Sequence, residues 1–336
     1  MCVSDRRRWT EMEEIMNNHI SIIIPTMNRL ETLSETLDSY VSGDIIPNQI
    51  IIVDQTQDDE IRLQIVSMVQ KYSKYAHIDY IYQNIPSSTK ARNIGINICK
   101  NDIIVFSDDD ITVRKDTIKN VLDIMENNDI SMIAGINSND QISKSKIGYL
   151  FGKKSYGKRK IGHVTKAMLG RFPEKRVEKS VDTEWAMGFF FIVRKSLIKR
   201  WNNYFDEKLT SYAYAEDLDF SSSYYKHSKD ESLRCILNEN IVVEHRVSTE
   251  WRIPTRKSTM MYVLNRAYLS YKHQMGWQSR ILMRWCNFGD FLMRLGKRAE
   301  ALDILRAQRI CDKHRKELAK GILKAEWYES DITESK

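Results

Sequence analysis

Three adjacent aspartates, Asp108, Asp109 and Asp110, directly follow a short apolar run at residues 103–106. At the end of a buried strand, such carboxylates raise one another's pKa values and cost stability unless a cation or hydrogen-bond donors offset their charge. Carboxylate oxygens combined with phosphate oxygens are the usual ligands of Mg²⁺ or Mn²⁺. The triplet therefore favours a divalent-metal site, and a solvated acidic loop without a metal is the alternative.

A second acidic candidate, Asp54, follows the β-branched run at residues 49–53. In that position a carboxylate can accept hydrogen bonds from a ribose or a base, although a helix-capping aspartate would look the same. After the run at residues 20–24 the chain has no Gly-x-Gly-x-x-Gly, so the tight pyrophosphate turn of a dinucleotide site is missing. A nicotinamide-dependent enzyme is therefore disfavoured.

The elements that must position these residues alternate between short β-branched runs and longer helix-periodic segments. Such alternation predicts a parallel sheet with helices on its faces, and ligands of such sheets bind at the carboxyl ends of the strands. The expected strands span residues 20–24, 49–53, 78–82 and 103–106, and the expected helices span residues 30–40, 59–75, 89–100 and 115–127.

The rest of the chain is less regular and more basic. Residues 144–179 are rich in Lys, Arg and Gly and predict a mobile basic excursion. Regular structure is expected again at residues 184–193, 204–225 and 236–243. From residue 256 onward the chain is Arg/Lys-rich with a helical period, which predicts a separate helical tail.

Composition excludes several classes of protein. The 336 residues are 42% hydrophobic and 29% charged, as in a globular protein. The longest apolar run, residues 185–193, is too short to span a membrane, and acidic residues replace the apolar part of a signal peptide. Five scattered cysteines suggest neither disulfides nor a zinc knuckle and fit a reducing cytoplasm. A net charge of +7 would suit nucleic acid, an anionic membrane surface or a phosphorylated substrate.

The order of the short motifs is more informative than any one of them. They are Ile22-Ile23-Ile24-Pro25-Thr26-Met27-Asn28-Arg29, Ile52-Val53-Asp54, Ala91-Arg92-Asn93-Ile94-Gly95 and Phe106-Ser107-Asp108-Asp109-Asp110. This series resembles the family 2 glycosyltransferases of the GT-A fold over about the first two thirds of the chain. The resemblance implies a nucleotide-sugar site formed by Pro25, Thr26, Asn28, Asp54, Arg92, Asp108 and Asp109.

The same resemblance implies the metal ligands and the catalytic base. Asp108 and Asp110 match the family's Asp-x-Asp signature, and His245 stands where relatives often have a third ligand, although a lone histidine can also be structural. The segment around Glu216 and Asp217 looks like the family's acceptor side, where a Glu-Asp pair opens a helix. A carboxylate at a helix N-terminus is stabilised and rigidly held, so Asp217 is the expected base and Glu216 its orienting neighbour, with plain helix capping as the alternative.

The expected fold is therefore an α/β GT-A-type nucleotide-binding sandwich, with a mostly parallel sheet flanked by helices and a C-terminal helical extension. The expected domains are an N-terminal tail at residues 1–18, the GT-A domain at 19–255 and a basic helical region at 256–336. The expected activity is metal-dependent, inverting sugar transfer (EC 2.4 class) of a bacterial surface-glycan type. It would use Mn²⁺ or Mg²⁺, a nucleoside-diphosphate sugar such as a UDP-sugar, and a hydroxyl of a glycan or of a lipid-diphosphate-linked acceptor.

Two rival functions and two uses of the basic segments stay open at this point. A nucleotidyltransferase would usually have a Gly-rich phosphate loop, and a nucleic-acid-binding or scaffold protein would leave the aspartates without a role, so no nucleic-acid partner is expected. The basic segments would attach the protein to the inner face of an anionic membrane, or they would pack on the catalytic domain or form a homo-oligomer. The tail residues that favour a membrane are Arg284, Trp285, Phe288, Phe291, Leu292 and Met293.

Overall fold

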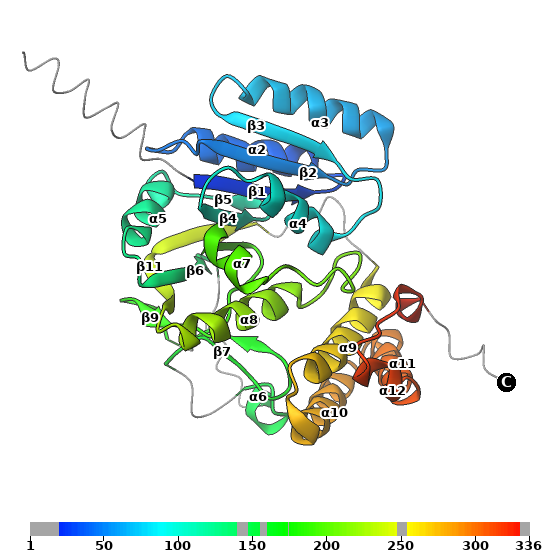
Figure 1. Cartoon of the computed structure of the whole chain (residues 1–336). Helices are drawn as coiled ribbons and strands as arrows, with labels where there is room; N and C mark the ends of the chain where they lie inside the picture. Colours follow the sequence, from blue (N-terminus) through cyan, green and yellow to red (C-terminus); the bar gives the residue numbers. More distant parts are fainter. Residues whose placement is uncertain (1–19, 140–146, 155–159, 174, 247–253, 330–336) are drawn as a thin grey trace, which may run out of the picture.

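A computed structural model describes residues 20–139, 147–154, 160–173, 175–246 and 254–329. The expected N-terminal tail at residues 1–18 lies outside the described residues. The centre of the molecule is a mixed sheet in the order β3-β2-β1-β4-β10-β6-β11-β5, with β9 pairing with β11 (Figure 1). The strands are β1 (Ile20–Thr26), β2 (Gln49–Asp54), β3 (His77–Tyr82), β4 (Ile103–Ser107), β5 (Ile111–Thr112), β6 (Ile130–Asn137), β9 (Val181–Asp182), β10 (Phe190–Arg194) and β11 (Arg234–His245).

Four neighbouring strands, β3, β2, β1 and β4, run parallel, and β10 is antiparallel to both β4 and β6. The pairing of Ile22 with both Ile50 and Val105 fixes the register of β1 between β2 and β4. The carboxyl ends of β1, β2 and β4 therefore lie at one edge of the sheet. The residues that follow these strands meet there, as the alternation in the sequence predicted.

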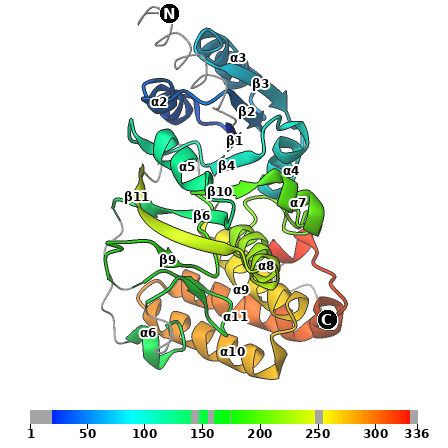
Figure 2. The same ribbon diagram turned by 60° about the vertical axis from the view of Figure 1, so that its left-hand side comes forward.

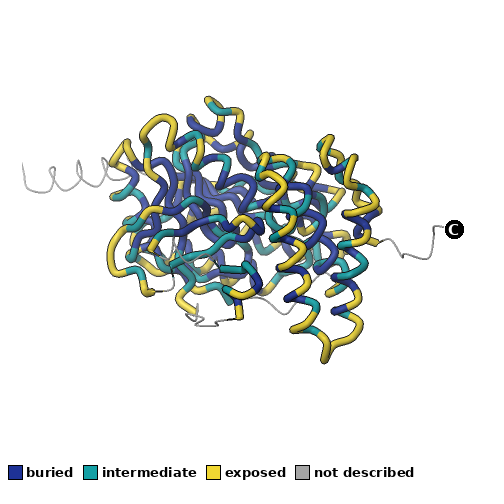
Figure 3. The backbone as a smooth tube through the Cα atoms, turned by 90° about the horizontal axis from the view of Figure 1, so that it is seen from below, coloured by how far each residue is buried: buried dark blue, intermediate teal, exposed yellow. Residues whose placement is uncertain are grey.

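Both faces of the sheet are covered by helices, because successive strand side chains point to opposite sides. Ile22 and Ile24 pack with α2, α3 and α5, whereas Ile23 packs with α4, α7 and α8. Figure 3 shows the resulting buried interior between exposed outer helix surfaces. The helices are α2 (Leu30–Val41), α3 (Asp59–Tyr72), α4 (Ser88–Ile98), α5 (Thr117–Met125), α7 (Lys195–Trp201) and α8 (Glu216–Asp230).

The helical tail folds against the α/β part of the chain, at the end of the molecule opposite α3 (Figures 1 and 2). It comprises α9 (Thr255–Lys272), α10 (Gly276–Met293), α11 (Arg298–Lys313), α12 (Arg315–Ala319) and the 3₁₀ turn η1 (Ala325–Tyr328). One hydrophobic cluster joins these helices to Leu169, Trp185, Leu209 and Leu218. Among the described residues, no helix is long and apolar enough to cross a membrane.

Most expected elements are present within a few residues of the expected bounds, and the α/β class is confirmed. Three segments differ. Within residues 184–193, only the end forms a strand, which begins at Phe190. Within residues 204–225, the helix begins only at Glu216, because the residues just before it include Ser211, Ala213 and Ala215 in left-handed backbone conformations. The described part of the basic excursion contains three short regular elements, α6 (Ile147–Leu150), β7 (His163–Val164) and β8 (Gly170–Arg171).

Candidate active site

The aspartate triplet lies at the carboxyl end of β4, where a short antiparallel strand pairing brings a histidine beside it. β5 pairs antiparallel with the end of β11, so that His245 lies opposite Ile111. The backbone N–H of Arg246 also donates to the carbonyl of Asp110 at 3.0 Å. Two segments more than a hundred residues apart in sequence thereby converge on one point.

Asp108, Asp110 and His245 form a group whose potential ligand atoms all lie within 4.8 Å of one another. His245 Nε2 lies 3.1 Å from Asp110 Oδ1, and the imidazole stacks on Phe189 with ring centroids 5.3 Å apart. Two carboxylates and one imidazole make a donor set that suits Mn²⁺, with carboxylates also suiting Mg²⁺. The residues present therefore fit the metal that the sequence motif implies.

The middle aspartate of the triplet points elsewhere. Thr26 Oγ1 and Arg29 Nη1 each donate to the Asp109 carboxylate at 2.7 Å. Burial raises the pKa of Asp109 to about 6, while Arg29 and Thr26 act in the opposite direction. Asp109 thus ties the end of β4 to the segment that follows β1, which places the three carboxylates in a fixed orientation.

Arg92 connects Asp108 of the aspartate triplet to Glu216 at the start of α8. Its Nη2 donates to Asp108 Oδ1 at 3.1 Å and to the carbonyl of Gly188 at 3.0 Å, and its Nη1 pairs with Glu216. The side chain is almost fully buried, so this network replaces water as its solvation shell. Arg92 lies inside the protein rather than on a helix surface.

Asp217 lies at the start of α8 with its carboxylate held by two backbone donors. The N–H of Gly188 donates to Oδ2 and the N–H of Leu218 to Oδ1, each at 2.7 Å. A side chain at position 188 would crowd this group, because a Cβ there would lie 3.3 Å from Asp217 Cβ. Burial raises the pKa of Asp217, and the backbone hydrogen bonds and Arg92 oppose that rise.

Two adjoining cavities meet at these carboxylates. The first, of about 510 Å³, is lined by the carboxyl end of β1, including Pro25 and Thr26, and by residues after β4, including Asp110. The second, of about 360 Å³, is lined by Arg92, Glu216 and Asp217. Both cavities share Ser88, Asp108, Tyr212, Tyr214 and His245. Asp108 and His245 of the metal group therefore lie where the two cavities meet.

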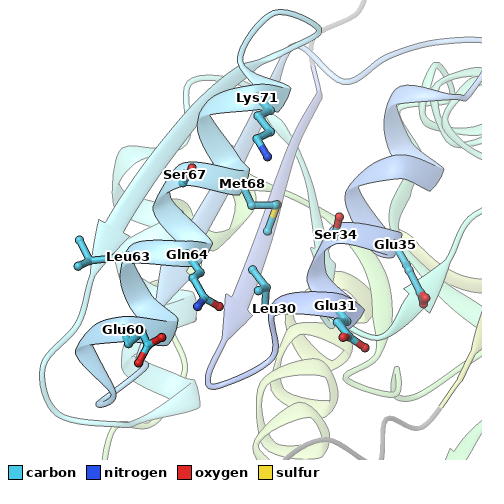
Figure 4. A pocket seen from close by; sticks show the side chains of 10 residues that line it. All are labelled: Leu30, Glu31, Ser34, Glu35, Glu60, Leu63, Gln64, Ser67, Met68 and Lys71. Carbon is cyan, nitrogen blue, oxygen red and sulfur yellow. The ribbon is translucent and has the colours of Figure 1, made fainter.

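A larger groove of about 780 Å³ lies elsewhere, between α2 and α3. In Figure 4 its walls are Leu30 and Met68 with acidic and amide side chains around them. It contains none of the expected site residues, so its size does not make it the candidate active site.

Three of the expected nucleotide residues do not line the first cavity: Arg92 lines the second cavity, and Asp54 and Asn28 line neither. Asp54 is fully buried and accepts hydrogen bonds from the N–H of Thr56 at 2.8 Å and from Tyr80 Oη at 2.7 Å. Asn28 adopts a positive φ, and its N–H donates to Thr56 Oγ1 at 2.9 Å. A role for either residue in binding the nucleotide stays a prediction.

Several lining residues gave no signal in the sequence. Gln55, rather than Asp54, reaches the first cavity, and Tyr212 lines both cavities. Tyr212 belongs to a loop in which Ser211, Ala213 and Ala215 all have positive φ. Such conformations are strained for residues other than glycine and cluster at functional sites. The residue types Ser and Ala do not predict them. Arg29 lay within an expected motif, yet its pairing with Asp109 was not foreseen.

Comparisons with known proteins show which proteins this chain resembles in sequence and in fold. A galactosyltransferase from Escherichia coli, described as UDP-Gal:alpha-D-GlcNAc-diphosphoundecaprenol beta-1,3-galactosyltransferase, is 26% identical over 104 residues, which cover 30% of this chain and 37% of that enzyme. The chain thus matches little more than a third of the length of this relative.

Two solved structures share the fold. The mannosyltransferase PcManGT from Pyrobaculum calidifontis, in complex with GDP-Man and Mn²⁺, has a TM-score of 0.51 and 12% identity, covering 90% of this chain and 79% of that one. GalNAc-T7 with UDP, GalNAc and Mn²⁺ has a TM-score of 0.54 and 15% identity, covering 81% of this chain and 54% of that one. A family model described as "Glycosyl transferase family 2" matches residues 21–201, more than half of the chain. The chain belongs to glycosyl transferase family 2.

Proposed function

We propose that this protein transfers a sugar from a nucleoside-diphosphate sugar to a hydroxyl group of a glycan or of a lipid-diphosphate-linked acceptor, with inversion at the anomeric carbon. The observation that carries the proposal is the pair of cavities that meet at Asp108 and His245, with Asp217 in the second cavity. Family membership supplies the class of reaction.

The donor is assigned to the first cavity because all three members of the metal group line it, whereas Asp110 does not line the second. Asp108, Asp110 and His245 would hold Mn²⁺ or Mg²⁺. When bound, the divalent cation would neutralise the negative charge that develops on the departing nucleoside diphosphate. Two structural neighbours contain Mn²⁺, one with GDP-Man and the other with UDP. We propose a UDP-sugar as the donor because the Escherichia coli relative is described as using UDP-Gal.

Asp217 is assigned the role of general base. The acceptor oxygen bonds to the anomeric carbon as the bond from that carbon to the diphosphate oxygen breaks, and the acceptor proton passes to the Asp217 carboxylate. Because this is one displacement, the anomeric configuration inverts. Gly188 and Leu218 orient the carboxylate, and Arg92 holds Glu216 beside it.

The acceptor class follows from the same relative, which is described as acting on a sugar linked to diphosphoundecaprenol. We propose a related acceptor here, with residues 19–255 as the catalytic domain and the region from residue 256 as a supporting helical region. Transfer to such a lipid-linked acceptor would take place at the inner face of a membrane in a polysaccharide pathway.

The test is a donor-hydrolysis screen of uridine, guanosine and thymidine diphosphate sugars with Mn²⁺ or Mg²⁺. We expect turnover that stops on chelation and falls by roughly 10²-fold or more in Asp110→Ala, which removes a carboxylate aimed at the metal. Asp123→Ala on α5 removes an exposed aspartate and is the matched control. Full turnover in excess chelator would show that the metal assignment is wrong.

A further inference from the structure

The surface of α10 away from the core carries an unusual row of apolar side chains. Its buried face contains Ser279, Met283, Cys286 and Gly289, and the exposed row lies on the opposite side of the helix. Trp277 is 64% exposed. The spacing of three or four residues puts the row on a single helix face and continues it into the following turn. The row, here named the α10 stripe, consists of Trp277, Ile281, Trp285, Phe288, Leu292 and Leu295.

The short helix α6 extends this stripe sideways. Trp285 Nε1 donates to the carbonyl of Leu150 at 2.7 Å, and the Trp285 ring lies 5.2 Å from that of Phe151. Leu150 is itself 65% exposed. Figures 1 and 2 both place α6 beside α10 at the end of the molecule opposite α3. Contiguous exposed apolar area of this kind marks a surface that contacts another molecule or a membrane.

A basic pocket opens along one side of the stripe, between α9, α10, α11 and α12. It encloses about 290 Å³, and Trp277 and Ile281 belong to both the stripe and the pocket wall. Its charged lining consists of Arg266, Arg280, Arg284 and Arg315 against Asp312, which pairs with Arg284. Among the described lining residues, positive charge is therefore in clear excess.

Arg266 is the most informative member of the pocket, because it is 1% exposed. Its Nε donates to the carbonyl of Ala167 at 3.0 Å, its Nη1 donates to Asn287 Oδ1 at 3.1 Å, and the guanidinium lies 4.3 Å from the centre of the Tyr262 ring. Its Nη2 has no hydrogen-bond partner among the described residues, and Asp290 acts on the guanidinium only through space. A buried guanidinium nitrogen without a hydrogen-bond acceptor is costly, so this group favours a bound anion.

We propose that the arginine pocket and the α10 stripe together dock the protein on a membrane surface that contains anionic phospholipid. A lipid phosphate enters the pocket beside Arg266, and the apolar side chains of the stripe enter the boundary between headgroups and acyl chains. Two tryptophans suit this boundary, since the ring is apolar and its N–H is polar. The inference does not require sugar transfer, although it agrees with a lipid-linked acceptor.

Charge favours a lipid surface over a second copy of the chain. A two-fold contact through the stripe would place two equivalent arginine pockets near one another, and like charges would oppose it. An anionic lipid surface supplies the opposite charge and the apolar layer at the same time. A contact between copies is then the main alternative outcome of the test.

The experiment is co-sedimentation of the full chain with vesicles of phosphatidylcholine alone or mixed with phosphatidylglycerol, at low and high salt. We expect binding to the anionic vesicles that weakens at high salt. Arg280→Gln/Arg315→Gln should lower the partition coefficient by roughly fivefold per arginine, and Trp277→Ser/Ile281→Ser by roughly tenfold or more. Lys71→Gln/Lys74→Gln and Leu63→Ser make matched exposed changes on and just after α3, at the far end, and should bind like wild type.

Circular dichroism and donor hydrolysis in solution should remain at wild-type levels in the stripe variants, so failure of membrane docking is distinguishable from failure of the proposed reaction. Absence of binding to anionic vesicles at low salt would overturn the proposal. The proposal would also be overturned if the control variants on and after α3 lowered vesicle binding as much as the stripe variants do. If the wild-type chain self-associates but does not bind vesicles, and Trp277→Ser/Ile281→Ser abolishes that self-association, the stripe is a contact between copies. Stabilisation by inorganic phosphate that Arg280→Gln/Arg315→Gln abolishes, without vesicle binding, would assign the pocket to a free phosphate ligand and overturn membrane docking.

Discussion

The Asp217 carboxylate shows how a few backbone groups prepare a side chain for proton transfer. Gly188 and Leu218 each donate an N–H to it, so its orientation is set before an acceptor arrives. Glu216 is turned away into the ion pair with Arg92, and Asp219 is bound to Lys272 and His273. Of these three acidic residues, Asp217 is therefore the one whose carboxylate is held by backbone donors at the second cavity.

Replacing Asp217 by asparagine should separate binding from chemistry. The amide keeps the shape of the side chain but cannot take a proton, so transfer should fall by roughly 10²-fold or more while the dissociation constant of the donor nucleotide stays unchanged. The measurements are steady-state transfer and nucleotide titration, with Asp123→Asn as the control. Wild-type transfer by Asp217→Asn would move the base to Glu216.

The pH dependence of transfer should report the raised pKa of Asp217. Only the ionised carboxylate accepts the acceptor proton, so the rate is full above its pKa and is lost as the pH falls through it. Burial moves that midpoint above the ordinary aspartate value of about 3.9. The measurement is kcat/KM against pH, with nucleotide affinity followed over the same range to separate loss of donor binding. A midpoint at or below the ordinary value would contradict the burial of this group.

At the scale of elements, Gly95 brings the site together by permitting close approach of a helix to the sheet. A Cβ at Gly95 would lie 2.4 Å from Ile23 Cγ2, so α4 can pack on β1 only because this position is glycine. That packing determines where Arg92, one turn earlier on α4, enters the network. The site therefore depends on contacts that lie outside its own chemistry.

The alternation of strands and helices, the aspartate triplet and the acidic pair at the start of α8 were predictable because hydrophobic period and local motifs carry them. Other features depend on tertiary contacts. Arg29 contacts Asp109 only because β1 and β4 are neighbours, and Gln55 rather than Asp54 reaches the cavity because Tyr80 and Thr56 hold Asp54 inward. Of the regular structure expected at residues 204–225, only the part from Glu216 is helical, because Ser211, Ala213 and Ala215 in the preceding loop have positive φ values that their side chains do not signal in the sequence.

Substitution of Gly95 tests this account of α4. Gly95→Ala inserts a methyl group into the side chain of Ile23, and such overpacking costs typically about 1–3 kcal/mol of unfolding free energy. Because α4 must shift, nucleotide or acceptor binding should weaken as well. Gly296→Ala is the matched control, since a Cβ there meets nothing within 4 Å. Urea unfolding that is equal for the two variants would mean that α4 has room to adjust.

At the scale of the whole molecule, the helical tail and the wall of the second cavity share one core. Met260 and Leu264 of α9 belong to the same cluster as Leu169, Trp185 and Leu218 around the second cavity. Charged contacts reinforce the junction, because Lys272 donates to Asp206 and Asp219 at 2.8 and 2.6 Å. The boundary expected at residues 255–256 therefore divides the sequence at a place where the packing is continuous.

Continuous packing predicts one cooperative unfolding transition for the catalytic half and the helical region. Leu264→Ala removes a fully buried side chain from the tail and should cost about 2–5 kcal/mol, as should Ile52→Ala in the sheet. In a single cooperative unit both changes lower the same midpoint, whether it is followed by far-ultraviolet circular dichroism or by tryptophan fluorescence. Two independent domains would instead give two transitions, with Leu264→Ala lowering only one of them. The tail cluster also contains Leu169 and Leu218, which line the second cavity. Leu264→Ala should therefore weaken acceptor binding more than donor binding. An equal effect on both affinities would argue against assigning the acceptor to the second cavity.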